Sequence, residues 1–586
     1  MSSNKEERSE LSEAVAQLRP FFVRGAWFSV VTSLLVLAPS GYMLEVYERV
    51  VNSRSHATLL WLTVVVLGAY VLMEVLEWAR AQVMHAAADR LDARLHERVF
   101  KAMFEANVRR IPGGTQQSMS DLRQVCSFLY SPALLAIMEA PVALVMMVLL
   151  FMISPVLGWT AIAFGVLQTG VTWLNERYTK QPLMEANKTA MAAQQYADNT
   201  LRNTEVIESM GMLRNLQRRW MLKQQAFLGL QAQASDAAGG FHALSKFLQT
   251  VLSSTLLGLA CWLLLHNMLN GGGGMMIIAS ILGGRMLAPL VQVVSQWKGV
   301  INARDAWNRL DALLTAIPAQ EDSMALPAPK GHVQVEQLMA SAPGVNGNAI
   351  LRGVAFALQP GDVLAVVGPS ASGKTTLARL LVGLWPSLSG KVRLDGADIK
   401  TWNKAELGPY VGYLPQGVEL FEGTVAENIA RFGQVDMAKV EAAARTVGVY
   451  DLVMSWPQGF DTPVGPGGAS LSGGQRQRVA LARAFYGEPV YIVLDEPNSS
   501  LDEVGEQALA QALAQASARG ATVVVVTHRT SILKVVNKML VLKDGQQQAF
   551  GPRDSVLAAL QQQAQQQRVA GGTAPAVTGA SAALPR

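Results

Sequence analysis

Charged residues are scarce in this chain. Asp, Glu, Lys and Arg make up 16% of its 586 residues, against about 25% in an average soluble protein. Half of the residues are hydrophobic, and the mean hydropathy is +0.22. Disorder of the whole chain is excluded, because disorder requires few apolar residues and many charges. A purely soluble enzyme is also disfavoured, because this much apolar surface needs lipid or an unusually large core.

Cysteine is almost absent, and the net charge is small. With two cysteines, Cys126 and Cys261, the sequence predicts neither a disulfide framework nor a cysteine-bound metal cluster. We expect both to be inert packing residues. The net charge of +5 gives no case for nucleic-acid binding. Yet 49 basic and 44 acidic residues need water, so we predict one membrane part and one water-soluble part.

Long apolar runs occur only before about residue 300. A membrane-spanning helix needs about 20 mostly apolar residues. Six runs fit this length, at 25–44, 58–77, 133–152, 156–174, 247–266 and 275–295. The first follows a polar stretch and has no small-residue cleavage site behind it, so we do not expect a cleaved signal peptide. Buried helices of a soluble protein are the alternative, and six runs of spanning length argue against it.

Basic residues lie in two long loops between these runs. One loop carries them from Arg80 to Arg110 and the other from Arg177 to Lys223, whereas the turns 153–155 and 267–274 carry none. The positive-inside rule therefore predicts that both loops and both termini are cytoplasmic. Few glycines or prolines interrupt 82–108 and 183–225, so we expect helices that continue past the bilayer.

Arg285 is a charge inside the sixth apolar run. A charge at that depth is costly and usually faces a bundle interior or a watery cavity. Alternatively, it lies near the cytoplasmic end and its long side chain reaches the interface. The first interpretation makes Arg285 a candidate residue of a translocation cavity.

Beyond residue 333 the pattern changes to short β-branched runs separated by helical stretches. The apolar strand 363–367 leads into Gly-Pro-Ser-Ala-Ser-Gly-Lys-Thr, which is a P-loop pattern. Its glycines let backbone N–H groups surround a phosphate, and the helix predicted at 376–384 presents its positive N-terminus. Lys374 would reach the β- and γ-phosphates, and Thr375 would bind Mg²⁺. The predicted ATP-binding residues are Gly368, Pro369, Ser370, Ala371, Ser372, Gly373, Lys374, Thr375 and Thr376.

A second apolar strand, 490–494, ends in Asp495 and Glu496. This spacing places two acids at the carboxyl end of a strand beside the P-loop. Asp495 would hold Mg²⁺, and Glu496 is the candidate general base that polarises the attacking water. Two charges that merely end a strand are the alternative, which the upstream P-loop disfavours.

A third element, Leu-Ser-Gly-Gly-Gln at 471–475, precedes an amphipathic helix at 476–486. Ser472 is expected to cap that helix, and the two glycines, Gly473 and Gly474, permit close approach of an anion. One chain needs a second phosphate-binding helix end only if that end serves a different nucleotide.

With these motifs the sequence resembles the ATP-binding cassette (ABC) family. The resemblance implies a Q-loop at Gln416, with catalytic and magnesium-binding roles, and a switch histidine at His528. It also implies a signature motif, which contacts the γ-phosphate held by a second subunit, and a D-loop with Ser where Ala is usual. The signature residues would be Leu471, Ser472, Gly473, Gly474 and Gln475, the D-loop residues Ser500, Leu501 and Asp502, and the magnesium ligands Thr375, Gln416 and Asp495.

Six spans followed by one cassette resemble the half-transporter arrangement of ABC exporters. The implied fold is multi-domain: an all-α six-helix transmembrane domain followed by an α/β P-loop ATPase domain. The predicted boundaries are 1–20 for a cytoplasmic tail, 21–315 for the transmembrane domain, 316–332 for a linker, 333–560 for the nucleotide-binding domain and 561–586 for a disordered tail.

Four stretches resemble the inner-membrane ATPases of type I secretion systems, of the alkaline-protease (PrtD-like) kind. They are 42–50, 283–289 together with 297–298, 412–421 and 494–502, where Asn498 replaces the usual Thr. This resemblance implies a homodimer in the bacterial inner membrane, in contact with lipid but not with nucleic acid. It further implies a periplasmic membrane-fusion adaptor, an outer-membrane channel and an unfolded protein substrate with a C-terminal signal.

Two departures from the family pattern stand out. The stretch 339–344 lacks the aromatic residue that usually stacks on adenine, so we expect Ala342 or its neighbours near the base. In the loop 464–468, Pro466 stands where exporters often have Glu. Other functions stay open: export of lipids, peptides or drugs without an adaptor, or a membrane-tethered regulatory ATPase. The six spans exclude a soluble ABC ATPase.

Overall fold

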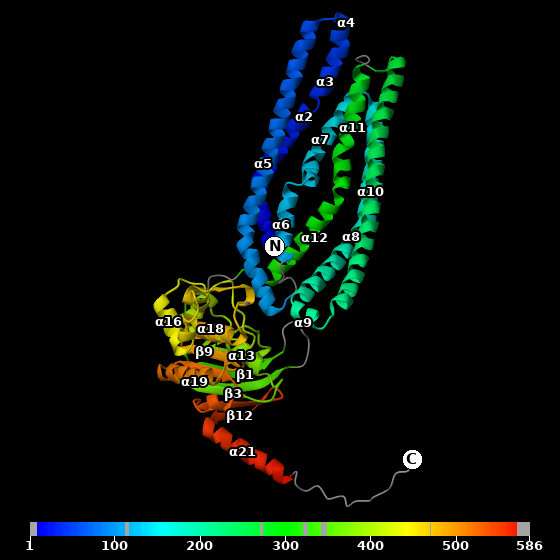
Figure 1. Cartoon of the computed structure of the whole chain (residues 1–586). Coiled ribbons are helices and arrows are strands. Elements are labelled where there is room, and N and C mark those ends of the chain that lie inside the picture. Colours follow the sequence, from blue (N-terminus) through cyan, green and yellow to red (C-terminus); the bar gives the residue numbers. More distant parts are fainter. Residues whose placement is uncertain are drawn as a thin grey trace, which may run out of the picture. The chain divides into compact units, whose positions relative to one another are not determined.

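The chain folds into two compact units. The computed structural model describes residues 9–111, 117–269, 274–319, 326–341, 349–468 and 470–570. The membrane unit comprises Met1–Asn107 and Pro112–Ala319, and the α/β unit comprises Val108–Ile111 and Gln320–Arg586. In Figure 1 the membrane unit is coloured blue to green, and the α/β unit green to red.

The described part of the membrane unit is helical. Six of its helical segments are long and apolar enough to span a membrane, which confirms the six predicted spans. The elements are α1 (Glu10–Ala16), α2 (Arg19–Leu35), α3 (Ala38–Glu45), η1 (Val46–Val50), α4 (Val51–Ser53), α5 (His56–Arg109), α6 (Gln117–Leu129), α7 (Pro132–Ile153), α8 (Pro155–Leu201), α9 (Thr204–Ser209), α10 (Leu213–Leu265), α11 (Gly274–Ser295) and α12 (Trp297–Ala316).

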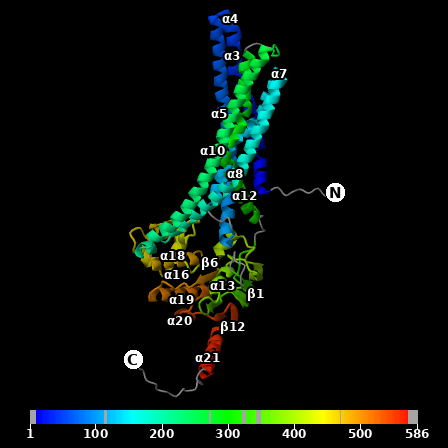
Figure 2. The same ribbon diagram turned by 90° about the vertical axis from the view of Figure 1, so that its right-hand side faces the viewer.

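Several of these helices are longer than a bilayer is thick. Helix α5 has 54 residues, which at 1.5 Å per residue gives about 80 Å, against about 30 Å of hydrocarbon. Its length includes the helix predicted at 82–108, and Figure 2 shows α5 and α10 as long rods. The helix predicted at 183–225 is interrupted: α8 ends at Leu201, α9 is short, and α10 begins at Leu213. Gly211 lies between them with φ +61, a left-handed conformation that ends helices.

Apolar side chains cover much of the surface of the membrane unit. The most apolar window of α5 is 0% buried, and Trp61 and Val65 are 68% and 66% exposed. Such a surface requires lipid or a second protein around it. Cys126 is buried but Cys261 is exposed, so the prediction that both cysteines pack inside is wrong for Cys261, which lies on an outward face of α10.

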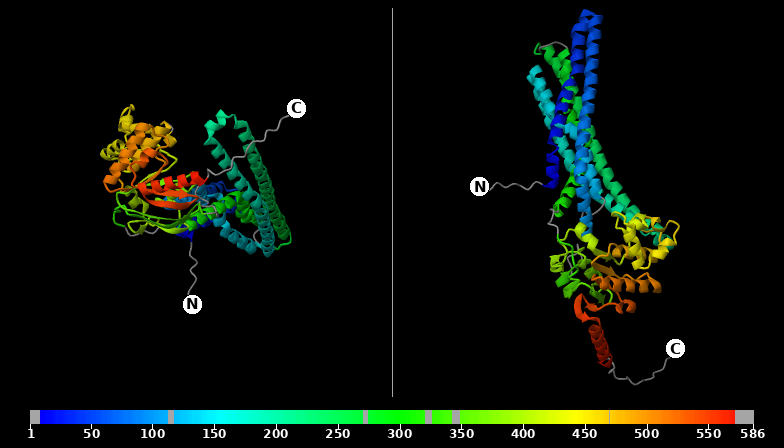
Figure 3. Two further views of the ribbon diagram at one scale, coloured as in Figure 1. Left: turned by 90° about the horizontal axis from the view of Figure 1, so that it is seen from below. Right: turned by 90° about the vertical axis from the view of Figure 1, so that its left-hand side faces the viewer.

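The core of the membrane unit lies between α7, α8, α10 and α11. Leu150, Leu157 and Leu256 from three of these helices are fully buried in it. Ser154 is extended between α7 and α8, which gives the predicted tight turn. Further along, where α8 passes α10, the rings of Tyr178 and Phe241 stack 6.1 Å apart. Both views of Figure 3 show these two helices side by side.

The α/β unit is built on a six-stranded sheet with the order β12-β11-β3-β10-β9-β6. Neighbours from β11 to β6 are parallel, and β12 is antiparallel to β11. A second, antiparallel sheet has the order β2-β1-β4-β5, and β7 pairs with β8. The strands are β1 (Val333–Ala340), β2 (Leu351–Leu358), β3 (Val363–Val367), β4 (Ser389–Leu394), β5 (Ala397–Asp398), β6 (Val411–Leu414), β7 (Gly423–Thr424), β8 (Pro463–Val464), β9 (Tyr491–Asp495), β10 (Thr522–Val526), β11 (Lys538–Lys543) and β12 (Gln546–Pro552).

Two hydrophobic cores lie on opposite faces of the main sheet. Successive strand residues point to opposite faces, so Ile492 and Leu494 join one core while Tyr491 and Val493 join the other. The covering helices and turns are α13 (Lys374–Leu381), α14 (Lys404–Leu407), η2 (Gly408–Tyr410), α15 (Val425–Ile429), α16 (Met437–Thr446), α17 (Tyr450–Met454), η3 (Gly459–Asp461), η4 (Pro466–Gly468), α18 (Gly473–Phe485), α19 (Glu503–Ala518), α20 (Thr530–Leu533) and α21 (Arg553–Ala570).

The predicted strands and helices occur with small shifts at their ends. The strand predicted at 363–367 coincides with β3, and the one at 490–494 is shifted by one residue in β9. The helices predicted from 376 and 476 begin earlier, at Lys374 and Gly473, because glycines in each motif already belong to the turn or first helical residues. Helix α21 continues to Ala570, past the predicted start of a disordered tail at 561.

Candidate functional site

The P-loop lies where the sheet topology predicts it, between β3 and α13. Gly368 has φ +159, and a Cβ there would lie 2.2 Å from the carbonyl oxygen of Leu542. Gly373 has φ +94, and a Cβ there would lie 2.7 Å from the side chain of Leu351. The two positions therefore require glycine for space and for backbone conformation. The loop leads directly into the N-terminus of α13, so its backbone N–H groups lie next to the positive end of the helix. This is the arrangement that a phosphate site requires.

Lys374 is held against the P-loop itself. Its ammonium donates to the carbonyl oxygens of Gly368 at 2.9 Å and Pro369 at 2.8 Å. Both acceptors belong to the loop that would surround a phosphate. A phosphate oxygen is a stronger acceptor for an ammonium than a neutral carbonyl, so Lys374 can exchange these bonds for an anion.

Asp495 ends β9 and is almost completely enclosed. It is 1% exposed, and neither carboxylate oxygen has a hydrogen-bond partner. Burial raises the pKa of this carboxyl above its usual value, Glu496 raises it further, and the nearby Thr375 hydroxyl and Lys374 oppose the shift. A buried carboxylate without a partner is costly, so the site is one that a cation would stabilise.

The donor set fits Mg²⁺. Asp495 and the neighbouring Thr375 offer a carboxylate and a hydroxyl oxygen, and Mg²⁺ in phosphate sites is typically held by one or two protein oxygens plus phosphate and water. No group of three or more His, Cys, Asp or Glu side chains in the described ranges could hold a metal by itself. A metal here would therefore depend on a bound nucleotide for its remaining ligands.

Glu496 and Gln416 meet beside Asp495. The amide nitrogen of Gln416 donates to the Glu496 carboxylate at 3.3 Å. Glu496 has φ +52, which is unusual for a residue with a side chain, and its N–H donates to the Val526 carbonyl at 3.0 Å. That bond ties the residue to β10, and the left-handed turn redirects its side chain away from the course of β9. Two predicted catalytic residues, far apart in sequence, are thus brought together.

The third predicted catalytic residue, His528, follows β10 at the same edge of the sheet. Val526 is the register partner of Asp495, so His528 comes two residues beyond the level of Asp495. Strand β10 also lies between β3 and β9, which means that the P-loop and the two acids flank the histidine strand. His528 is exposed, as a group that contacts a nucleotide would be.

The signature motif forms a separate helix end. Ser472 caps α18 through a capping box, accepting from the N–H of Gln475 at 3.3 Å while the Gln475 side chain accepts from the N–H of Ser472 at 2.8 Å. Among the described residues no hydrogen bond or ion pair joins 471–475 to the P-loop. The chain therefore presents two anion-type helix ends, one with Lys374 and one open.

The two glycines of the signature motif differ in their surroundings. A Cβ on Gly473 would meet nothing within 4 Å, whereas a Cβ on Gly474 would lie 2.9 Å from the carbonyl oxygen of Ser500. The sequence-based expectation gave both glycines the same role, the close approach of an anion. The small size of Gly474 has a second use within the chain, because it lets the D-loop backbone pack against α18. The contact of Gly474 with a second subunit's nucleotide stays a prediction.

The D-loop follows Glu496 and is anchored to α18. Asp502 accepts from the guanidinium of Arg478 at 2.5 Å and from the N–H of Gly505 at 2.9 Å, which caps α19. These bonds hold the pKa of Asp502 below its usual value, with the Gly505 bond as the largest cause. Ser500 and Asp502 are therefore placed by the same helix that begins with the signature motif.

Gln477 is a site residue that the sequence reasoning missed. It is 3% exposed, and its amide donates to the carbonyls of Glu496 at 3.3 Å and Pro497 at 2.5 Å while accepting from the N–H of Ser500 at 2.8 Å. One side chain therefore fixes the whole segment from the catalytic acid to the D-loop. An amide at a buried position of the amphipathic helix α18 is the signal that could have pointed to it.

The two departures from the family pattern lie in the stretches 339–344 and 464–468. Ala342, expected near the adenine, lies outside the described residues. Around Pro466, the backbone forms the short turn η4 with Gly467 at φ +65. The consequences of the missing aromatic residue and of the missing Glu stay predictions.

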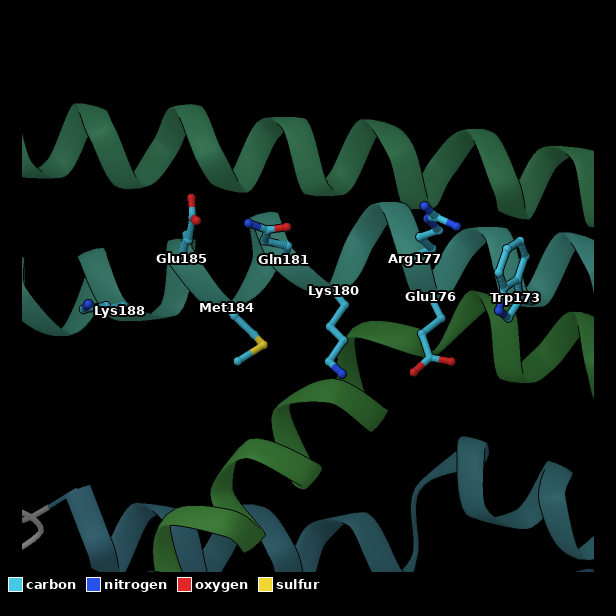
Figure 4. Close-up of a pocket in the computed structure, with 8 residues that line it drawn as sticks. All are labelled: Trp173, Glu176, Arg177, Lys180, Gln181, Met184, Glu185 and Lys188. Carbon is cyan, nitrogen blue, oxygen red and sulfur yellow. The ribbon is translucent and has the colours of Figure 1, made fainter.

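In the membrane unit, a cavity of about 720 Å³ lies along α8. Glu176, Lys180 and Met184 point to one side of the helix, and Arg177 and Glu185 point to the other (Figure 4). Its residues are Trp173, Glu176, Arg177, Lys180, Gln181, Met184, Glu185 and Lys188. The cavity is thus lined by charges of both signs together with apolar side chains.

Arg285, the predicted cavity residue, lies on α11 and is not among the residues that line this space. It is exposed, and its neighbours Met286 and Leu287 are buried. The guanidinium therefore points out of the helix bundle of this chain, which leaves both sequence-based interpretations of Arg285 open.

Comparison with known proteins places both units. Residues 25–286 match the family described as the ABC transporter transmembrane region, and residues 351–499 match the family described as ABC transporter. The chain is 38% identical over 559 residues to the type I secretion system ATP-binding protein PrsD of Rhizobium meliloti (strain 1021), covering 95% of this chain and 96% of that protein. It is 26% identical to the toxin RTX-I translocation ATP-binding protein of Actinobacillus pleuropneumoniae, over 93% of this chain and 77% of the other.

A solved structure has the same fold. A bacterial Atm1-family ABC exporter with ATP bound matches 96% of this chain and 100% of its own, with a TM-score of 0.81 and 21% identity. The α/β unit carries the P-loop, the paired acids and the signature helix, and the membrane unit carries the six spans. The chain therefore belongs to the ABC transporter family, as an exporter half-transporter that joins a transmembrane domain to an ATP-hydrolysing domain and is related to the type I secretion ATP-binding proteins.

Proposed function

We propose that this chain exports a protein substrate across the bacterial inner membrane as the ABC component of a type I secretion system. The observation that carries the proposal is the 38% identity, over nearly the full length of both chains, to a type I secretion ATP-binding protein. Two further relatives are named for the translocation of a toxin and a leukotoxin, which supports protein as the cargo.

The proposed active form is a homodimer with two nucleotide sites. Each site would combine the P-loop, Gln416, Asp495, Glu496 and His528 of one copy with the signature motif of the other. The open surface at Gly473 and the unused helix end at Ser472 support this arrangement, because a second anion-type helix end has no use within one copy.

In such a site each side chain has a defined task. Lys374 transfers from its loop carbonyls to the β- and γ-phosphates. Asp495, Thr375 and Gln416 would hold Mg²⁺, which would neutralise charge on the phosphate oxygens. Glu496 accepts a proton from the attacking water, and Gln416, already bonded to Glu496, keeps that carboxylate oriented. His528 contacts the transferred phosphate from the end of β10.

Transport follows from a preference of ATP for the closed dimer. A ligand shifts a conformational equilibrium only through its different affinities for the two states. ATP between two copies makes contacts that exist only when they close, so binding drives closure and hydrolysis removes the preference. The closure would move the long helices that extend from the spans and open the cavity to the far side.

The cavity along α8 is the proposed contact surface for the cargo. Trp173 and Met184 are 57% and 43% exposed, and charges of both signs flank them. This mixture suits an unfolded polypeptide, which presents both apolar and charged side chains, better than a uniformly apolar lipid. Both termini would be cytoplasmic, and a periplasmic adaptor and an outer-membrane channel would complete the path.

The substitution Glu496→Gln tests the catalytic assignment. It removes the base but keeps the shape and the hydrogen-bond capacity of the side chain, so ATP should still bind and dimerise the cassettes. Removal of a general base costs typically 10²–10⁴-fold in rate, and we expect ATP turnover to fall by about that factor. Near-normal turnover would show that Glu496 is not the base.

The adaptor tests the type I assignment. Affinity purification of the full-length chain from its native cells should recover a periplasmic membrane-fusion protein, and passenger secretion should require it. An exporter of lipids, peptides or drugs, the alternative, would transport its substrate in vesicles with no adaptor present. Transport of that kind would replace the proposal while leaving the ATPase assignment intact.

A further inference from the structure

A second cavity, of about 280 Å³, lies in the α/β unit outside the residues of the nucleotide site. Three cationic side chains line it: Lys404 at the start of α14, Arg431 after α15, and Arg483 near the end of α18. The rest of its wall includes Val382 and Tyr413. Its size is close to the lower limit of small-molecule sites, about 300 Å³.

Arg431 is fixed and fully used. Its guanidinium donates to carbonyl oxygens at Gly408 (2.6 Å), Val411 (3.0 Å) and Arg483 (3.1 Å), with longer bonds to Ala484 and Tyr486. An arginine has five N–H donors, so this side chain has little left to offer a ligand. It contributes a permanent positive charge to the cavity wall.

Lys404 and Arg483 keep free donors. The ammonium of Lys404 donates to the carbonyls of Val382 at 3.1 Å and Ile399 at 2.9 Å, and an ammonium has a third N–H. Nη2 of Arg483 donates to the Glu419 carbonyl at 3.1 Å, whereas its Nη1 is buried and has no hydrogen-bond partner. Lys404 and Arg483, which both line the cavity, therefore each keep an N–H group that no protein acceptor uses, and a rotation of the Arg483 guanidinium would turn its enclosed Nη1 toward the cavity.

The charges at this cavity lack a matching anion. Among the described residues, no carboxylate forms an ion pair with Lys404, Arg431 or Arg483. Burial lowers the pKa of Lys404 to about 8, against a weaker opposing effect of Asp398, and burial also lowers the pKa of both arginines. Buried charges without a partner are costly, and a bound anion is the direct way to remove that cost.

We propose that this cavity binds a small oxyanion of the phosphate class, with Lys404 and Arg483 donating to its oxygens and Arg431 supplying a third charge. Free inorganic phosphate, the product of the ATP hydrolysis that this family performs, is the ligand. The inference depends on the ATPase but not on the proposed secretion of a protein.

The cavity is placed to affect the catalytic residues. Tyr413, in its wall, is in β6, three residues before Gln416. Arg483 is on α18, the helix that begins with the signature motif and carries Gln477. An anion that bridges Lys404 and Arg483 would fix the end of α18 against α14, and would thereby oppose movements of the Q-loop and the signature helix during turnover.

The test measures anion binding with the nucleotide site already filled. The full-length chain in detergent, saturated with a non-hydrolysable ATP analogue and Mg²⁺, is titrated with sulfate at pH 7, against chloride at equal ionic strength. Sulfate is used because it is a tetrahedral oxyanion whose charge is constant at this pH. We expect the thermal midpoint of the wild type to rise with sulfate and to saturate.

Lys404→Met should raise the half-maximal sulfate concentration by about tenfold or more, as expected for loss of a charge-assisted bond. The matched control is Lys400→Met, which removes an exposed lysine from the same segment and should respond like the wild type. Arg483→Lys keeps the charge but loses the forked donor, and serves if Lys404→Met fails to fold. An equal sulfate response in the wild type and in a folded cavity variant, or no response in the wild type, overturns the proposal.

Discussion

The two units use similar apolar residues in opposite ways. Every residue of β9 and β10 is buried, whereas the most apolar window of α5 is 0% buried. Strands of five residues are enclosed between two hydrophobic cores, and a helix of 54 residues turns the same kinds of side chain outward. The length of an apolar run therefore indicates the environment of its side chains. Short runs lie in a protein core, and long runs face lipid or a second copy of the chain.

The same contrast applies to buried polar groups. In the α/β unit the buried carboxylate of Asp495 has no partner and lies at the nucleotide site. In the membrane unit Nη1 of the buried Arg80 donates to Glu139 at 2.5 Å and to Ser29 at 3.1 Å, while its Nε has no partner. The unpartnered carboxylate lies where a cation and a nucleotide would bind, whereas the Nη1 bonds of Arg80 tie α2, α5 and α7 together.

The largest expected stability effect concerns this tie in the membrane unit. Arg80→Met leaves Glu139 without its cation. Breaking a fully buried pair on one side costs about 3–5 kcal/mol, and the Glu139 side chain is 32% exposed, so we expect a loss at the lower end, about 3 kcal/mol. Unfolding of the purified chain in detergent measures the loss. The double variant Arg80→Met/Glu139→Leu should recover most of it, because it removes both charges. A single variant as stable as the wild type would show that the pair is not structural.

A smaller effect is expected at Gln477, and it should appear in turnover rather than in binding. Gln477→Glu keeps the shape of the side chain. It replaces the amide nitrogen, which donates to the carbonyl oxygens of Glu496 and Pro497, with a carboxylate oxygen that can only accept. A small displacement of a catalytic group can cost about 10²-fold, so kcat for ATP should fall by about 10–100-fold while ATP binding stays near normal. Ser499→Ala, which removes only a 3.2 Å bond to the same amide, is the control. A proportional loss of binding in Gln477→Glu would indicate general misfolding.

The smallest effect is expected for an ion pair on the surface of the α/β unit. Arg519 and Glu488 lie 3.4 Å apart, and the side chain of Glu488 is 71% exposed. Exposed pairs contribute about 0–1 kcal/mol, so Glu488→Gln should change the free energy of unfolding by less than the Arg80 substitution does. If Glu488→Gln lowered the free energy of unfolding as much as Arg80→Met does, the distinction between the exposed pair of the α/β unit and the Arg80 pair of the membrane unit would be wrong.

Sequence alone predicted the features whose chemistry is local. The P-loop, the acids that end β9 and the cap of α18 each occupy a few consecutive residues, and a turn or cap requires those residue types. Apolar length predicted the six spans for the same reason. The break between α8 and α10 was missed because no proline or glycine marks the end of α8 at Leu201, and the left-handed Gly211 ends only the short α9.

Features made by distant residues could not be predicted in this way. Gln477 contacts the segment from Glu496 to Ser500, and Arg80 contacts Glu139, through packing that no pattern of neighbours encodes. The close approach of the Ser500 carbonyl to Gly474 is of the same kind.

The cavity at Lys404 similarly joins α14, α15 and α18. The burial predicted for Cys261 was wrong because cysteine usually packs inside a water-soluble core, a preference that has less force on a lipid-facing helix.

The central claim is that this chain drives protein export, and secretion from a host cell that co-expresses the components tests it most directly. The full-length chain is expressed with the proposed adaptor and outer-membrane channel and with a passenger that carries a C-terminal secretion signal, and passenger in the medium is measured. The account predicts export with the wild type and none with Glu496→Gln, which still binds ATP. Equal export by both variants, or ATP-dependent transport of a lipid or drug with no need for the adaptor, would contradict it.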